Sequence, residues 1–73
     1  MDGRLTAIKK RVGSAIRARR ISLKMSQEAL AYEADLSATY LSQLEAGKRN
    51  PSLEALLRIC FALKSDICDL FTK

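Results

Sequence analysis

The segment from Met25 to Ser52 constrains the fold of this chain more than any other part of the sequence. It holds two short amphipathic patterns, at residues 27–33 and 38–46, separated by a tight turn and followed by a basic loop. Ser26 and Ser37 precede these patterns, and serine is a favoured N-cap because its hydroxyl accepts a hydrogen bond from an otherwise unpaired N–H of the first turn. The segment therefore predicts two helices joined by a turn, with one buried face and one small, polar, exposed face.

Further helical patterns flank this segment. Apolar residues recur every three or four positions near the start of the chain, at Leu5, Ile8, Val12 and Ile16. This spacing predicts a helix over about residues 5–23 with these residues in one buried stripe. Ser52 caps a predicted helix over 53–63, and a short helix is expected at 66–71. We therefore expect residues 1–73 to form one all-α domain with five helices.

Four positions have special backbone requirements. Gly13 lies inside the first helix and weakens it by about 1 kcal/mol relative to alanine, so we expect a neighbouring helix to approach closely there. Asp35 lies in the turn and tolerates a left-handed conformation better than most residues. Gly47 fits the position just after a helix, where a left-handed residue ends it. Pro51 keeps Asn50 out of a helical conformation.

The charge balance favours a polyanionic partner. Formal net charge is +5 and the pI is about 9.6, which suits either nucleic acid or an acidic membrane surface. Most cations of the first third lie on the predicted first helix, where they form either a solvated face or, beside a helix-turn-helix, a phosphate-contacting surface. No apolar stretch is long enough to span a bilayer and no signal peptide is evident. We therefore expect a cytoplasmic protein with no membrane partner.

Enzymatic, metal and cofactor chemistry are not expected. The chain has no histidine and no Cys-x-x-Cys, so a zinc site is not predicted. Its three glycines are scattered, so they build no phosphate-binding loop. Cys60 is expected to pack in the core, and with Cys68 it makes no disulfide framework. No enzyme activity, cofactor or small-molecule ligand is predicted.

Two strings carry a family resemblance. They are Val12-Gly13-x-x-Ile16-Arg17-x-x-Arg20 and Ser26-Gln27-Glu28-x-Leu30-Ala31, continued by Leu36-Ser37 and Tyr40-Leu41-Ser42-x-Leu44-Glu45-x-Gly47-Lys48-Arg49-Asn50-Pro51-Ser52-Leu53. From about residue 12 to residue 71 the sequence resembles the lambda-repressor-like helix-turn-helix family of the Cro/repressor or xenobiotic-response-element type. The resemblance implies a compact five-helix bundle whose helix-turn-helix covers about residues 26–46. It also implies that the helix at 38–46 enters the major groove of DNA.

The resemblance also implies the roles of individual residues. The base-reading positions are Ala38, Thr39, Ser42 and Gln43, and Gln43 can pair bidentately with adenine. The backbone-contacting positions are Gln27, Ser37, Tyr40, Lys48, Arg49, Asn50 and Arg17. Three alternatives stay open: Gln27 can be an ordinary first-turn residue, Tyr40 can pack at the domain edge, and Arg49 is long enough to reach a base. The base-reading face itself can be a solvated helix surface.

The family pattern implies one ion pair and shows two departures. Arg20 and Glu45 match a pair that ties the first helix to the recognition helix. Asp35 stands where the family usually has glycine, and Ala38 stands where a larger polar residue is often found. Direct base reading is therefore expected to be modest, with DNA shape and flexibility contributing to specificity.

Dimerisation is expected at the carboxy-terminal end, about residues 59–73. The expected interface residues are Leu63, Ile67, Cys68, Leu70 and Phe71. Completing the monomer core is the alternative role for Leu70 and Phe71. A two-fold dimer would place two recognition helices on half-sites about 34–36 Å apart.

These features predict a sequence-specific DNA-binding transcriptional regulator, and the resemblance implies a homodimer on a near-palindromic operator that regulates its own gene. The chain resembles small single-domain regulators of bacterial or phage origin: restriction–modification controller proteins and phage-type repressors. RNA polymerase is a further candidate partner of such a nucleoid-associated protein. An antitoxin or plasmid regulator, and a helical protein-interaction module that binds no DNA, are the alternatives.

Overall fold

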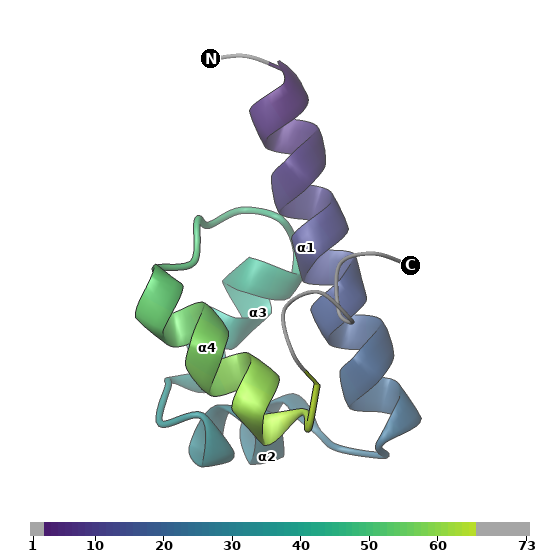
Figure 1. The fold of residues 1–73 in the computed structure, drawn as a ribbon, viewed down its shortest axis with the longest axis vertical. Helices are drawn as coiled ribbons and strands as arrows, with labels where there is room; N and C mark the ends of the chain where they lie inside the picture. The colour runs from purple at the N-terminus through teal and green to yellow at the C-terminus, as the bar shows by residue number, and fades with distance from the viewer. Residues whose placement is uncertain (1–2, 66–73) are drawn as a thin grey trace.

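The computed structural model describes residues 3–65 of the chain. Four helices follow one another in this range: α1 (Gly3–Ser22), α2 (Gln27–Glu33), α3 (Ala38–Glu45) and α4 (Leu53–Ala62) (Figure 1). The described residues contain no strand, which agrees with the expected all-α class. They show four helices rather than the five expected, because the short helix predicted at 66–71 lies outside the described range. None of the described helices is both long and apolar enough to cross a membrane.

Each helix after α1 begins at the serine expected to cap it. The hydroxyl oxygens of Ser26, Ser37 and Ser52 accept hydrogen bonds from backbone N–H groups three residues later, at 3.0, 3.0 and 3.1 Å. These bonds satisfy one of the unpaired donors in each first turn. The three expected caps are confirmed.

All four helices end in the same kind of turn. The residue after the C-cap is left-handed each time, with φ of 59° at Lys24, 56° at Asp35, 75° at Gly47 and 57° at Lys64. The next N–H then bonds back across the end of the helix, as from Lys48 to the carbonyl of Gln43 at 2.9 Å. This Schellman arrangement satisfies the last carbonyls. The left-handed conformations expected at Asp35 and Gly47 are confirmed.

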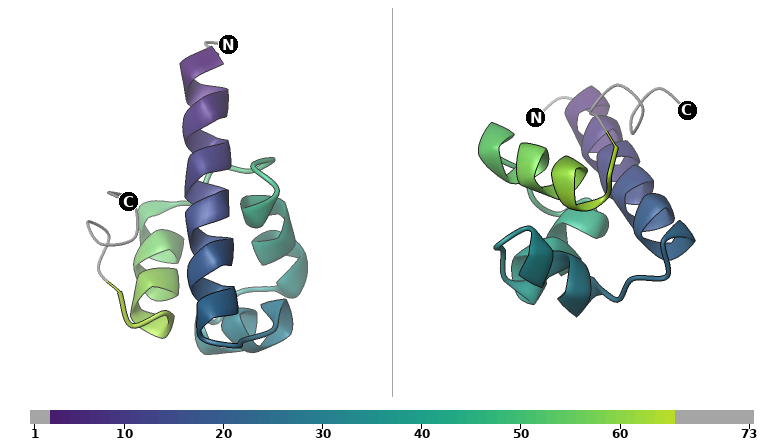
Figure 2. Two further views of the ribbon diagram at one scale, coloured as in Figure 1. Left: turned by 90° about the vertical axis from the view of Figure 1, so that its right-hand side faces the viewer. Right: turned by 60° about the horizontal axis from the view of Figure 1, so that its bottom comes forward.

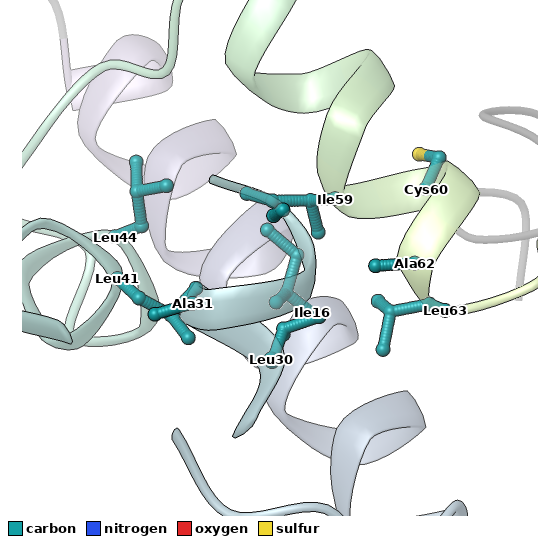
Figure 3. Close-up of a cluster of buried hydrophobic side chains, with 10 residues drawn as sticks. Ile16, Leu30, Ala31, Leu41, Leu44, Ile59, Cys60, Ala62 and Leu63 are labelled. Atoms are coloured by element: carbon teal, nitrogen blue, oxygen red, sulfur yellow. The ribbon is translucent and has the colours of Figure 1, made fainter. Parts of the chain in front are cut away.

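The core forms where all four helices meet, around the second half of α1 (Figure 3). Its fully buried large side chains are Ile16, Leu30, Leu41, Leu44, Ile59 and Leu63. Cys60 is buried among them, as expected.

The first half of α1 projects beyond this core (Figure 2). Leu5 and Ile8 are 47% and 53% exposed, so their placement in the buried stripe was wrong. The physical reason is length. α1 has 20 residues and spans about 30 Å, whereas α4 has 10 residues and spans about 15 Å. The shorter helices therefore cover only the later turns of α1, from Val12 onward.

Candidate nucleic-acid interface

α3 is held against α1 by direct backbone contact. A Cβ atom placed on Gly13 would lie 2.3 Å from the carbonyl oxygen of Leu44 and 2.7 Å from that of Glu45. A Cβ atom at this position would require the backbone of α1 or α3 to shift, so the close approach expected at Gly13 is confirmed. This contact determines where along α1 the last turn of α3 packs.

A buried ion pair provides a second attachment. The guanidinium of Arg20 donates to both carboxylate oxygens of Glu45, from Nε at 2.7 Å and from Nη2 at 3.0 Å. Its Nη1 donates to the carbonyl oxygen of Met25 at 2.8 Å. The side chains of Arg20 and Glu45 are only 10% and 3% exposed. The hydrogen bond to Glu45 raises the pKa of Arg20, partly opposed by burial. The pair anticipated from the family pattern is present, and it joins α1 to α3.

Gln27 joins α2 to the same carboxylate. Its Nε2 donates to Oε1 of Glu45 at 3.0 Å, which makes the amide a buttress between the two helices. Gln27 is the first residue of α2, so its backbone N–H has no partner within the helix. The backbone N–H of Gln27 and the second hydrogen on its Nε2 are therefore available to donate hydrogen bonds to a phosphate.

The exposed face of α3 has the composition expected of a groove-facing surface. Thr39 and Ser42 are exposed, while Ala38 and Gln43 are half-buried. Leu41 and Leu44 lie fully buried on the opposite side, as expected. Of the four expected base-reading residues, Thr39 and Ser42 therefore lie on the exposed polar face, Gln43 lies half-buried beside it, and Ala38 packs against the edge of the core. Ser37 precedes this face, and its hydroxyl hydrogen is unused by the cap it makes.

The loop after α3 folds back along the helix. Arg49 donates from Nε to Oε1 of Gln43 at 2.8 Å, and its guanidinium carbon lies 5.0 Å from the centre of the Tyr40 ring. The ring in turn packs against the core, which is the edge-packing role left open for Tyr40. Sequence reasoning treated Gln43 and Arg49 as separate contacts; the structure joins them.

The loop after α3 and the helix α1 carry further exposed polar and cationic residues. Lys48, Arg49 and Asn50 are exposed in the loop, as is Arg17 on α1. Lys10 was not expected among them. A Cβ placed on Gly47 would lie 2.8 Å from Cγ of Lys10, so Lys10 lies beside the loop. It precedes Arg17 by two helical turns and therefore shares its side of α1. The seven-residue spacing between Lys10 and Arg17 could have predicted from the sequence that both lie on the same side of the helix.

The described part of the expected dimer region requires one correction. Leu63 is completely buried in the monomer core, so its side chain is not available to a partner subunit. The other expected interface residues, Ile67, Cys68, Leu70 and Phe71, lie outside the described range. α4 instead presents an exposed apolar stripe of Leu53, Leu57 and Phe61, which recur every four residues, and Phe61 is 87% exposed.

Comparison with known proteins identifies relatives of this fold. The sequence profile of the helix-turn-helix family matches residues 16–70. Control protein C.BamHI of Bacillus amyloliquefaciens is 44% identical over 64 residues, which span 82% of this chain and 79% of the relative. The crystal structure of the restriction–modification controller protein C.AhdI from Aeromonas hydrophila superimposes with a TM-score of 0.86 at 34% identity, over 89% of this chain and 98% of that one.

A third similar structure is the tetramer of controller protein C.Esp1396I in complex with its natural 35-base-pair operator. It has a TM-score of 0.79 and 32% identity, over 86% of this chain and 83% of that one. The chain belongs to the helix-turn-helix family, whose members are DNA-binding transcriptional regulators. Within that family it is related to the controller proteins of restriction–modification systems.

Proposed function

We propose that this chain is a controller protein of a restriction–modification system, which binds a near-palindromic operator beside its own gene as a homodimer. The observation that carries the proposal is the fixation of α3. Backbone contact at Gly13 and the buried pair of Arg20 with Glu45 hold its polar face outward. A recognition helix gains specificity when its side chains are presented in one orientation.

In this proposal Thr39 and Ser42 touch base edges in the major groove, since both are exposed on the face of α3. Gln27 and Ser37 donate to phosphates from the two helix N-termini, where the helix dipoles also favour negative charge. Lys48, Asn50 and Arg17 add phosphate contacts, and Lys10 joins them. Such contacts set register on the duplex and make binding depend on salt.

The second subunit is expected to dock on the α4 side of the bundle. The stripe of Leu53, Leu57 and Phe61 is apolar and unpartnered within the described residues. Burial of such a stripe across a two-fold axis would pair two recognition helices about 34 Å apart. Dimerisation coupled to operator binding would make promoter occupancy depend steeply on protein concentration. We expect the protein to act in the cytoplasm. Binding upstream of the promoter would favour recruitment of RNA polymerase, whereas binding over the promoter would exclude polymerase.

Fluorescence anisotropy tests the proposal directly. The full chain is titrated onto the duplex from immediately upstream of its gene and onto a shuffled duplex of equal composition, over a series of salt concentrations. We expect the native duplex to bind at least about a thousandfold more tightly, with affinity falling steeply as salt rises. Equal affinity for both duplexes would refute an operator at that site. Absence of binding at low salt would favour a protein-interaction module.

A further inference from the structure

Two side chains beside the exposed face of α3 are bonded to each other. Nε of Arg49 donates to Oε1 of Gln43 at 2.8 Å. Arginine is only a donor, so the amide orientation of Gln43 is determined: its oxygen faces Arg49 and its Nε2 points elsewhere. Tyr40, Gln43 and Arg49, here called the amide–guanidinium cluster, therefore form one unit on the side of α3.

This cluster is anchored on both sides. The Tyr40 ring packs against the core, and the Arg49 guanidinium lies over it within the range of a cation–π contact. The chain returns to this place because Gly47 is left-handed, with φ of 75°, and because Lys48 bonds back to Gln43 at 2.9 Å. Nε of Arg49 donates to Gln43. Within the described residues, the Nη1 and Nη2 groups of Arg49 make no hydrogen bond.

Beyond the bond between them, Gln43 and Arg49 offer three donor groups to DNA, which are Nε2 of Gln43 and Nη1 and Nη2 of Arg49. They offer one acceptor site, the second lone pair of Gln43 Oε1. A bidentate pair between Gln43 and adenine needs the remaining lone pair of Oε1 to accept from the adenine N6 group, while the other lone pair already accepts a charge-assisted bond from Arg49. Guanine presents two acceptors, O6 and N7, and no donor on its major-groove edge.

We propose that Gln43 is a positioning residue for Arg49, and that the cluster selects a guanine in each half-site. The inference rests on the proposed function, since it names the base that this site prefers. It replaces the adenine contact expected for Gln43. Because the specificity of Arg49 depends on Gln43, substitution of either residue removes the same preference.

The experiment is selection from a randomised duplex pool by the full-length chain and four variants. Gln43→Met removes the acceptor at constant charge, and Arg49→Lys removes the planar fork at constant charge. Gln43→Glu keeps an acceptor for Nε, and Ser42→Ala is the matched control on the same face. Melting curves establish that each variant is folded, and affinity for shuffled DNA measures the phosphate contribution.

We expect the wild type to enrich guanine at one half-site position. Gln43→Met and Arg49→Lys should both lose that preference by about 5- to 150-fold at the same position, with little change in affinity for shuffled DNA. Gln43→Glu should retain the guanine at lower overall affinity, and Ser42→Ala should change a different position. A double Gln43→Met/Arg49→Lys variant should be no worse than either single one.

Other outcomes overturn the inference. They are enrichment of adenine in place of guanine, undiminished guanine preference in Gln43→Met, or losses at two different positions that add in the double variant. Enrichment of no sequence by the wild type would overturn the proposed function itself. Specific enrichment combined with additive losses would leave the proposed function standing and refute only the role of Gln43.

Discussion

Replacement of Glu45 by alanine is expected to destabilise the fold and weaken DNA binding together. Glu45 accepts hydrogen bonds from Nε and Nη2 of Arg20 at 2.7 and 3.0 Å, and from Gln27 at 3.0 Å. Its side chain is 3% exposed, and that of Arg20 is 10% exposed. The substitution would leave a buried cation whose remaining hydrogen-bond partner, the carbonyl of Met25, carries no formal charge.

The size of the effect follows from burial. Removal of one partner of a buried ion pair costs about 3–5 kcal/mol, because the other charge stays desolvated. Domains of this size are stable by only about 5–15 kcal/mol. Since 1 kcal/mol shifts Tm by about 4–8 °C in a small domain, we expect Tm to fall by roughly 12–40 °C. DNA affinity should fall as well, because α3 loses one of its attachments to α1.

The matched control is Glu54→Ala. Glu54 pairs with Arg58 one turn along α4, but its side chain is 73% exposed, and such surface pairs contribute about 0.3–0.5 kcal/mol. Thermal unfolding followed by circular dichroism, with anisotropy on the same samples, compares the two variants. A Tm for Glu45→Ala within about 4 °C of the wild type, equivalent to less than about 1 kcal/mol, would refute the stabilising role of the pair.

Three further outcomes are expected. Gly13→Ala should lower the free energy of unfolding by about 1–2 kcal/mol despite better helix propensity, because the new Cβ would meet the backbone of α3; an unchanged or raised Tm would contradict this contact. Asp35→Gly should raise the free energy of unfolding by about 0.5 kcal/mol, because glycine relieves the left-handed strain at φ 56°. The exposed contact of Asp35 with Arg58, which the substitution removes, contributes little stability, and denaturant midpoints decide the sign of the change. The stability difference between wild type and Arg20→Met should be the same at about pH 7 and about pH 10. The raised pKa of Arg20 keeps its contribution intact until pH passes the ordinary arginine range, and a difference that shrank by pH 10 would contradict the pairing.

Much of the local structure follows directly from the sequence. Ser26, Ser37 and Ser52 begin the helices that they were expected to begin, and Gly47 ends α3. These features depend on hydrogen bonds between residues three to five positions apart, so local chemistry is sufficient to specify them. The family pattern additionally anticipated the pair of Arg20 with Glu45, which no local rule connects.

Burial along α1 could not be predicted in the same way. Periodicity places Leu5, Ile8 and Ile16 near one side of the helix, but it contains no information on how far the neighbouring helices extend. The structure buries Ile16 completely and leaves Leu5 and Ile8 about half exposed. The prediction for Leu63 was wrong in the opposite direction. This residue was expected to be exposed at a subunit interface, but it is buried in the monomer core.

The sequence by itself determined the helices of the described range, their caps, and the small, polar composition of the α3 face. Only the tertiary structure decided how that face is arranged: Arg49 returns to Gln43 and Tyr40, Lys10 lies beside Gly47, and α3 is pressed onto Gly13. The physical reason is range. Caps and turns are formed within a few residues, whereas burial and side-chain pairing depend on where distant backbone segments come to lie.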